Sequence, residues 1–213
     1  MGVRRLLRRI VATGIARWRL PPALVLAGWA LQGCGTPPLP ETGIDDPTPA
    51  RFAYCRDNTC ETIKELSFDS QEWAAITEPL SQPAADPATE RVQIAETVAV
   101  FEQRAGVKAG TTTDIGGTIK GFFHPGQLDC IDETANTKTL LGMLENDGLL
   151  RWHRRGAHAT RLVILSDGLP HFTATVVENA TGQIYAVDSW FRDNGSPADV
   201  VPLEVWQDGW NPE

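Results

Sequence analysis

The chain has 213 residues and a formal net charge of −8, and this length suits one domain with a core of its own. Six of the 19 basic residues and none of the 27 acidic ones lie in the first 33 positions. The remainder therefore has 13 basic residues against 27 acidic ones, a net charge of about −14. This acidity argues against nucleic acid and anionic lipid headgroups as partners of the domain.

Residues 1–33 have the pattern of an export signal. An arginine-rich stretch precedes an apolar run at 22–31, and this run is shorter than the roughly 20 apolar residues that a membrane span needs. An amphipathic N-terminal helix of a cytosolic protein is the alternative. Pro21, Pro22 and the change of composition after residue 33 favour the signal, so we expect an exported protein.

The signal ends in Leu31-Gln32-Gly33-Cys34. This segment resembles the bacterial lipobox, in which the cysteine is lipidated and becomes the first residue of the mature protein. Gln32 departs from the small residue usual at its position, so a plain signal peptide is the alternative. The resemblance implies lipidation of Cys34 and a membrane-anchored protein of the bacterial cell envelope, facing the periplasm or the outer surface. Without the lipid the protein would be periplasmic.

Three segments are predicted after the signal: a Pro-rich tether at 34–50, an N-terminal hairpin and helical part at 51–120, and a core at 121–213. The first holds five prolines, which disfavour helix and sheet and indicate an extended chain.

The four cysteines separate by position. Cys55 and Cys60 flank a turn-like sequence between short strands predicted at 51–55 and 60–64, so we expect a disulfide in an oxidising compartment. Cys130 is then left without a partner. An odd thiol in an exported protein is a candidate reactive group, and a buried inert cysteine is the alternative.

Two helices are predicted in the N-terminal part. The first covers 69–80, with Asp69 or Ser70 as its cap. The second begins after Asp86, which can cap it and is followed by a first-turn proline, and it stops at Gly106.

The pattern of the last 93 residues predicts one helix packed on an antiparallel sheet, an α+β arrangement. The helix is expected from Cys130 to Asn146, and the strands at 159–165, 171–178, 183–190 and 200–206.

His171 begins one of these strands and Asp188 lies near the end of the next. A four-residue turn at 179–182 makes the numbers of paired residues sum to 361, which places His171 and Asp188 diagonally on one face of the hairpin. The other face is the expected core side; it carries Phe172, Ala174, Val176, Tyr185 and Val187.

Cys130 is expected at the N-terminus of its helix, with Asp129 as the cap. The helix dipole and free backbone N–H groups at such a position lower a thiol pKa. Asp129 and Asp132 oppose that shift, so an imidazolium at His171 is the predicted partner. A thiol, an imidazole and a carboxylate in this order are the parts of an activated-cysteine enzyme.

The chain resembles the bacterial transglutaminase-like cysteine proteinases of the papain-like superfamily over about residues 121–195. The matching stretches are 129–132, 137–141, 144–148, 171–177 and 182–188. The resemblance implies a papain-like, transglutaminase-like core with a catalytic triad. In this triad Cys130 is the nucleophile, His171 the general base and then acid, and Asp188 the residue that orients the imidazole. It also makes Gln127 the nearest candidate for the oxyanion hole.

The predicted function is acyl transfer through a thioester on Cys130, as a protease or amidase if water is the acceptor and as a transferase if an amine is. The expected partners are a protein or peptide substrate and the membrane that holds the anchor. No cofactor or metal is expected from the residues, since the histidine spacing fits no zinc motif; some members of the resembled family use acidic residues nearby for calcium. The alternative is a non-catalytic envelope lipoprotein that keeps the fold as a binding or assembly module.

Overall fold

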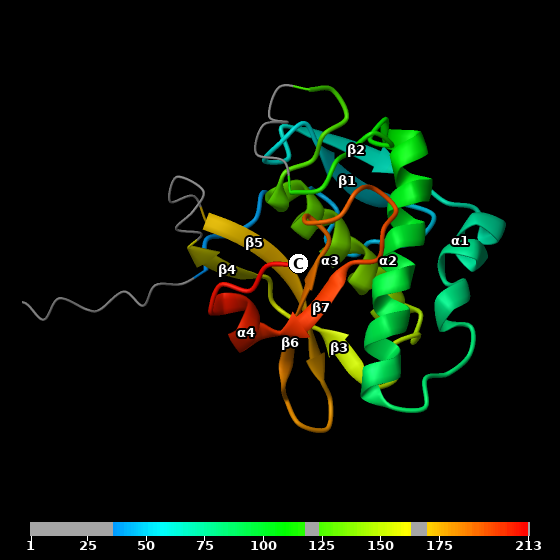
Figure 1. The fold of residues 1–213 in the computed structure, drawn as a ribbon. Coiled ribbons are helices and arrows are strands. Elements are labelled where there is room, and N and C mark those ends of the chain that lie inside the picture. The colour runs from blue at the N-terminus through cyan, green and yellow to red at the C-terminus, as the bar shows by residue number, and fades with distance from the viewer. Residues whose placement is uncertain (1–35, 118–123, 163–169, 213) are drawn as a thin grey trace, which may run out of the picture. The chain divides into compact units, whose positions relative to one another are not determined.

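The computed structural model describes residues 36–117, 124–162 and 170–212. The predicted signal, the lipobox with Cys34 and residues 163–165 of one predicted strand lie outside this part of the chain. The described residues form an α+β structure (Figure 1) with one two-stranded and one five-stranded antiparallel sheet. None of the helices within them has the length and apolar character of a membrane span.

The chain forms first a hairpin, then a series of helices, and then the larger sheet. In chain order they are β1 Phe52–Arg56, β2 Thr62–Leu66, α1 Ser70–Ile76, η1 Glu78–Leu80, α2 Pro87–Ala109, α3 Cys130–Asn146, β3 His153–Arg155, β4 Ala159–Leu162, β5 Pro170–Glu178, β6 Ile184–Asp188, β7 Asp199–Pro202 and α4 Leu203–Gln207.

The larger sheet has the order β3-β5-β6-β7, and β4 also pairs with β5. Ala174 faces Val187 and Val177 faces Ile184, so the numbers of paired residues sum to 361 and the predicted register is confirmed. Gly182 closes the turn with φ at 74°, a left-handed conformation that glycine adopts without a steric penalty. Because a one-residue slip would move every side chain to the other face, this turn decides which residues share a face with His171.

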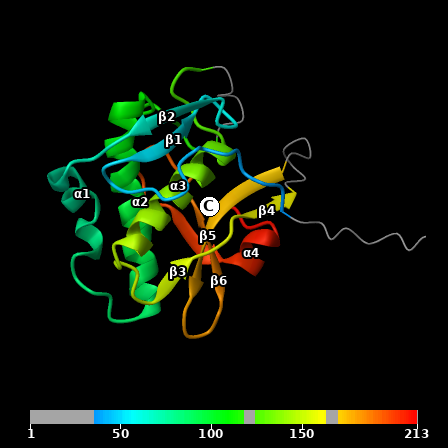
Figure 2. The same ribbon diagram turned by 180° about the vertical axis from the view of Figure 1, so that it is seen from behind.

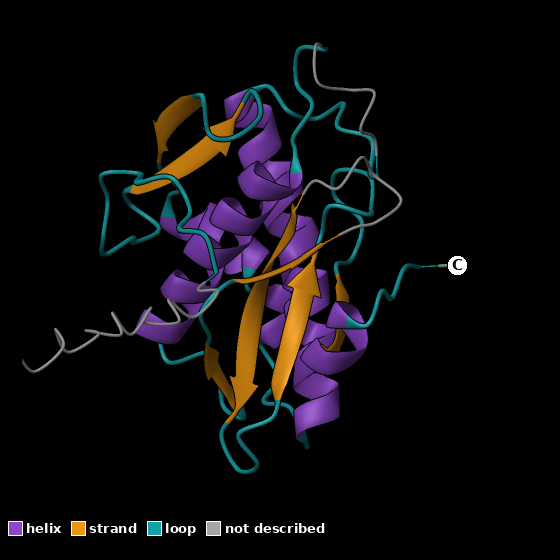
Figure 3. Cartoon of the chain, turned by 90° about the vertical axis from the view of Figure 1, so that its left-hand side faces the viewer, coloured by secondary structure: helices purple, strands orange, loops and turns teal. Residues whose placement is uncertain are grey.

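The helix α3 lies between the two sheets (Figures 1 and 2) and contacts both β1 and β5. Its residues Leu140, Leu141 and Leu144 are fully buried in a core that also takes Phe52 from β1 and Val176 from β5. Burial of one such side chain is worth about 1.5–3 kcal/mol. The described residues of the two predicted segments, 51–120 and 121–213, therefore share one core, with the hairpin on the far side of the helices from the larger sheet (Figure 3).

The N-cap residues identified in the sequence predicted where the helices begin. Asp69, Asp86 and Asp129 each accept hydrogen bonds from the first turn of the helix that follows, as predicted. The stop at Gly106 was wrong: α2 continues to Ala109 and ends at Gly110, whose φ of 87° forms the left-handed cap. Glycine is tolerated inside a helix, so Gly106 alone does not end one.

Other elements also differ from the sequence prediction: β2 begins at Thr62 and not at residue 60, and β6 ends at Asp188 and not at residue 190. The helix expected at 69–80 is divided at Thr77 into α1 and η1, with Pro79 in the second piece. The strand expected at 200–206 ends at Pro202, and α4 begins at the next residue. The short strand β3, which pairs with the end of β5, was not predicted because three residues carry no readable period.

The described part of the predicted tether, residues 36–50, contains bends and a turn and lies against the domain, so the extended chain expected from its prolines was wrong. His158 Nε2 bonds to the carbonyl of Pro37 at 2.7 Å, and Asn146 Nδ2 donates to Asp46 Oδ1 at 2.9 Å. The backbone N–H of Phe68 donates to the carbonyl of Pro49 at 2.7 Å. Residues 36–50 are thus part of the domain surface and do not form a free spacer.

Candidate active site

His171 and Asp188 meet at the end of the larger sheet. His171 is the second residue of β5 and Asp188 the last of β6. Their side chains are joined by a hydrogen bond of 2.7 Å between Nε2 and Oδ2, and they are only 3% and 2% exposed. When Nε2 carries the hydrogen and donates it to the carboxylate, Nδ1 is the nitrogen free to take a proton.

Cys130 is the first residue of α3, where the Asp129–Asp132 capping box fixes the start of the helix. Its Sγ lies 4.0 Å from the carbonyl oxygen of Pro170, and the backbone N–H of Phe172 donates to the sulfur. The thiol therefore sits against the backbone on both sides of His171, and it is partly exposed. All three predicted residues are brought to the same end of β5.

The electrostatics of the thiol differ from the sequence prediction. Burial, with a contribution from the carboxylates of Asp129 and Asp188, raises the pKa of Cys130 to about 12, although the N–H of Phe172 acts the other way. The predicted lowering of this pKa is thus contradicted, because desolvation of the thiol outweighs the stabilisation of a thiolate by the N-terminus of the helix. The resting thiol is neutral, and any nucleophilic step at Cys130 needs a base to remove its proton.

Trp206 belongs to the site and was not predicted there. Its indole Nε1–H donates to Asp188 Oδ2 at 2.7 Å, and the side chain is fully buried. The Arg161 guanidinium stacks on this indole at 4.6 Å and donates to the carbonyl of Trp206. The sequence analysis places Trp206 only at the end of the strand expected at 200–206, whereas the residue belongs to α4.

Aromatic rings enclose the imidazole. The ring centroids of Trp190, Phe191 and Trp206 lie 4.9, 5.1 and 5.4 Å from that of His171. Apolar rings exclude water from the His171–Asp188 hydrogen bond and so strengthen it. Trp190 and Phe191, which follow Asp188 closely in the sequence, thus form part of the wall around His171.

Gln127, the oxyanion-hole candidate, is buried beside the loop that follows α2. Its Nε2 donates to the carbonyl of Thr113 at 2.6 Å, and its Oε1 accepts from the backbone N–H of Ile115 at 3.1 Å. These bonds hold the 113–115 loop against the start of α3. The oxyanion role of Gln127 stays a prediction.

The predicted disulfide between Cys55 and Cys60 is present in the structure. Among the described residues, one group has ligand atoms spaced for a metal ion: the two sulfurs of this disulfide and the carboxylate of Asp132. Disulfide sulfurs are not thiolates, so this group does not offer the ligands of a zinc site.

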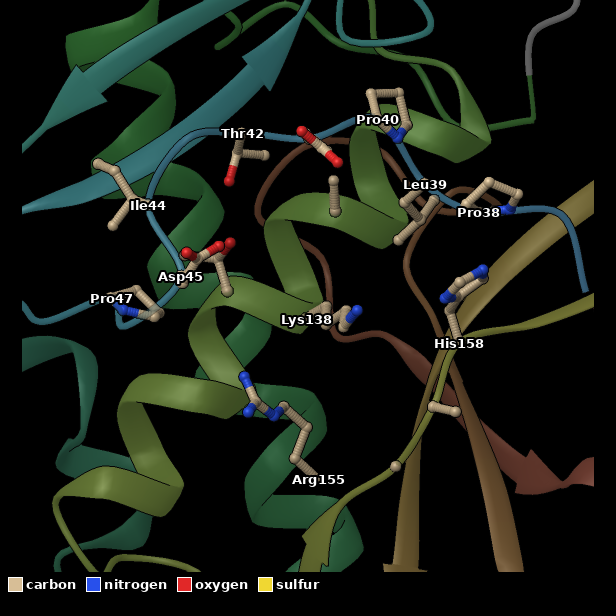
Figure 4. A pocket seen from close by; sticks show the side chains of 15 residues that line it. Pro38, Leu39, Pro40, Thr42, Ile44, Asp45, Pro47, Lys138, Arg155 and His158 are labelled. Atoms are coloured by element: carbon tan, nitrogen blue, oxygen red, sulfur yellow. The ribbon is translucent and has the colours of Figure 1, made fainter.

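A cavity of about 570 Å³ lies elsewhere, between residues 38–47 and the body of the domain. Figure 4 shows Lys138 and Arg155 on one wall and Asp45 with the prolines of the N-terminal segment on the other. None of Cys130, His171 and Asp188 lines it, so it is separate from the candidate active site.

The fold and the site define an α+β protein with a Cys-His-Asp grouping at the end of an antiparallel sheet. Comparisons of the chain with protein-family models, with curated proteins and with solved structures found no match. What the site does is therefore argued from its own geometry.

Proposed function

We propose that this protein is an exported thiol enzyme that transfers acyl groups through a thioester on Cys130, with a papain-like, transglutaminase-like core. The observation that carries the proposal is the 2.7 Å bond between His171 and Asp188, together with the position of the Cys130 sulfur against the backbone that flanks His171. Cys130 and the His171–Asp188 pair, which are far apart in sequence, lie at the same end of β5 with the residue types and the order that nucleophilic catalysis needs.

In the proposed reaction, Nδ1 of His171 takes the proton of the Cys130 thiol as the sulfur attacks the substrate carbonyl. The imidazolium gives that proton to the leaving amine, which departs when the tetrahedral intermediate collapses to a thioester. Water or a second amine then attacks the thioester and loses its proton to His171. The imidazolium returns this proton to the departing sulfur, which regenerates the neutral thiol of Cys130. Asp188 stabilises the imidazolium that forms in each half of the reaction.

The raised thiol pKa favours general-base catalysis over a resting thiolate–imidazolium pair. The substrate class is a protein or peptide, and the lipid at Cys34 would hold the enzyme at a membrane of the envelope. A second candidate, a non-catalytic envelope module with the same fold, is favoured by the same raised pKa, since an unassisted neutral thiol is a poor nucleophile.

The rate at which iodoacetamide labels Cys130 at pH 7.5 separates the two candidates. The full-length protein, purified in detergent, is compared with the His171→Ala variant, and labelling is read from the mass of the peptide that carries Cys130. We expect labelling to slow by about tenfold or more in the variant, because it loses the base. The His158→Ala variant is the matched control, since His158 is partly exposed and lines the cavity that is separate from the candidate active site. Equal rates in all three proteins would leave only the non-catalytic module.

A further inference from the structure

The turn closed by the Cys55–Cys60 disulfide has an unusual backbone. Asp57, Asn58, Thr59 and Cys60 have φ values of 69°, 64°, 52° and 55°, four consecutive left-handed residues without a glycine. Such a conformation costs roughly 1–2 kcal/mol for each residue with a side chain. It also aims successive backbone N–H groups to one side, which forms a concave binding site for an anion.

The carboxyl groups of Asp129 and Asp132, next to Cys130, occupy this concave site. The backbone N–H groups of Asn58 and Cys60 donate to Oδ2 and Oδ1 of Asp132 at 2.8 and 2.7 Å. The N–H of Thr59 donates to Asp129 Oδ2 at 2.8 Å. Asp132 is fully buried and Asp129 is 7% exposed, so each bond is shielded from water.

The same hairpin also forms hydrogen bonds with α3 one turn further along the helix. Asn136 accepts from the backbone N–H of Cys55 at 2.7 Å and donates to the carbonyl of the same residue at 2.9 Å. The disulfide packs against Ala135 and Ile131. The first two turns of α3 are thus fastened to the disulfide turn by hydrogen bonds and apolar contact.

We propose that the disulfide-closed turn at residues 55–60 is a positioning element of the active site, which holds the carboxylates of Asp129 and Asp132 and through them the start of the helix that carries Cys130. The inference rests on the proposed function, since positioning matters only for a reactive Cys130. A dithiol that gives two electrons and two protons to the disulfide, and becomes a disulfide itself, leaves thiols at Cys55 and Cys60. This releases the turn from its left-handed conformation and lowers the reactivity of Cys130.

The test compares full-length wild type with the Cys55→Ser, Cys60→Ser double variant, labelling Cys130 with iodoacetamide across pH 6–10. We expect the variant to label at least about fivefold more slowly, with its pH profile displaced upward, because three N–H dipoles no longer offset the carboxylates. The carboxylates that act on the thiol are those of Asp129 at its own cap and Asp188 from the sheet. Burial also raises the pKa of Asp132, the third residue of the helix, to about 7, so this group titrates within the tested range. The Asp57→Asn variant is the control, because it leaves the three N–H groups in place and asparagine tolerates the left-handed conformation.

A folded double variant that labels at the wild-type rate and pH profile would overturn the inference. If the double variant does not fold, Asp132→Asn with the disulfide intact replaces it. We then expect dithiothreitol to reduce the disulfide faster than in wild type, because an amide nitrogen cannot accept one of the two N–H bonds that Asp132 accepts. An unchanged reduction rate would overturn the inference. If wild type labels slowly and the His171→Ala variant labels at the same rate, the proposed function itself is contradicted.

Discussion

The indole N–H of Trp206 and the imidazole of His171 both bond to Oδ2 of Asp188, each at 2.7 Å. One carboxylate oxygen is thereby held from two sides inside a buried setting. The two donors come from different elements, α4 and β5, so the orientation of the carboxylate depends on the packing of the C-terminal segment. Asp188 can then direct His171 only while Trp206 holds it.

The first prediction follows from this arrangement. Trp206→Phe keeps a ring in the core and removes the donor, so we expect a loss of about 1–3 kcal/mol in the free energy of unfolding. We also expect slower labelling of Cys130, because Asp188 is freer to turn away from His171. Chemical denaturation and iodoacetamide labelling measure the two effects. The control is Trp210→Phe, since Trp210 contacts Phe191 through its ring. Labelling that is equally fast in Trp206→Phe and wild type would contradict the positioning role.

The thiol itself supplies the second prediction. Because burial raises the pKa of Cys130 to about 12, the labelling rate should keep rising with pH from 7 to 10. A plateau below pH 8 would mean a resting thiolate–imidazolium pair and would contradict the neutral thiol inferred from the structure. Cys130→Ala, which should take no label at this position at any pH, identifies the signal.

Parts of this site could be read from the sequence because local rules decide them. The cap at Asp129 set the start of the helix, and the four-residue turn at 179–182 set the register that brings His171 to Asp188. Trp206 could not be assigned to Asp188, because that contact joins residues of different elements and no periodic pattern connects them. The thiol pKa was missed for a related reason: the sequence gives the helix start but not the burial.

The disulfide turn shows the opposite case, where tertiary contacts override local preference. Asparagine and aspartate tolerate left-handed backbone, but a β-branched residue such as Thr59 rarely adopts it. Its N–H is held by Asp129, which is 70 residues away in the sequence. Local rules therefore predicted a turn between Cys55 and Cys60 and not its conformation.

The third prediction tests that strain. Thr59→Gly removes the side chain at φ 52° and keeps the N–H that binds Asp129. Relief of the left-handed strain outweighs the added entropy of a glycine in the unfolded chain, so we expect a gain of about 0.5–1 kcal/mol in the free energy of unfolding. Asn58→Gly should gain less, because asparagine is already suited to this backbone. Denaturant titration compares the two, and a loss of stability in Thr59→Gly would show that the threonine side chain itself stabilises the turn.

A group of buried carboxyls sits beside the candidate active site. Burial raises the pKa of Glu102 to about 8 and that of Asp114 to about 6, and it also raises the pKa of Glu133. The hydroxyl of Ser189, the residue after Asp188, donates to Glu133 Oε2 at 2.7 Å. The group is thus connected to the end of β6.

The last prediction concerns stability and pH. In the unfolded chain these acids lose their protons near pH 4, whereas Glu102 keeps its proton in the folded protein up to about pH 8. Between these values the folded state binds more protons, so the free energy of unfolding falls as pH rises through this window. Glu102→Gln removes one ionisable group and keeps the shape, so the fall in melting temperature from pH 5 to pH 8 should be smaller than in wild type. Glu65→Gln is the control, because Glu65 is exposed on β2 and pairs with Arg51. If the Glu102→Gln and wild-type slopes are equal, Glu102 is ionised in the folded protein and its charge is balanced by another group.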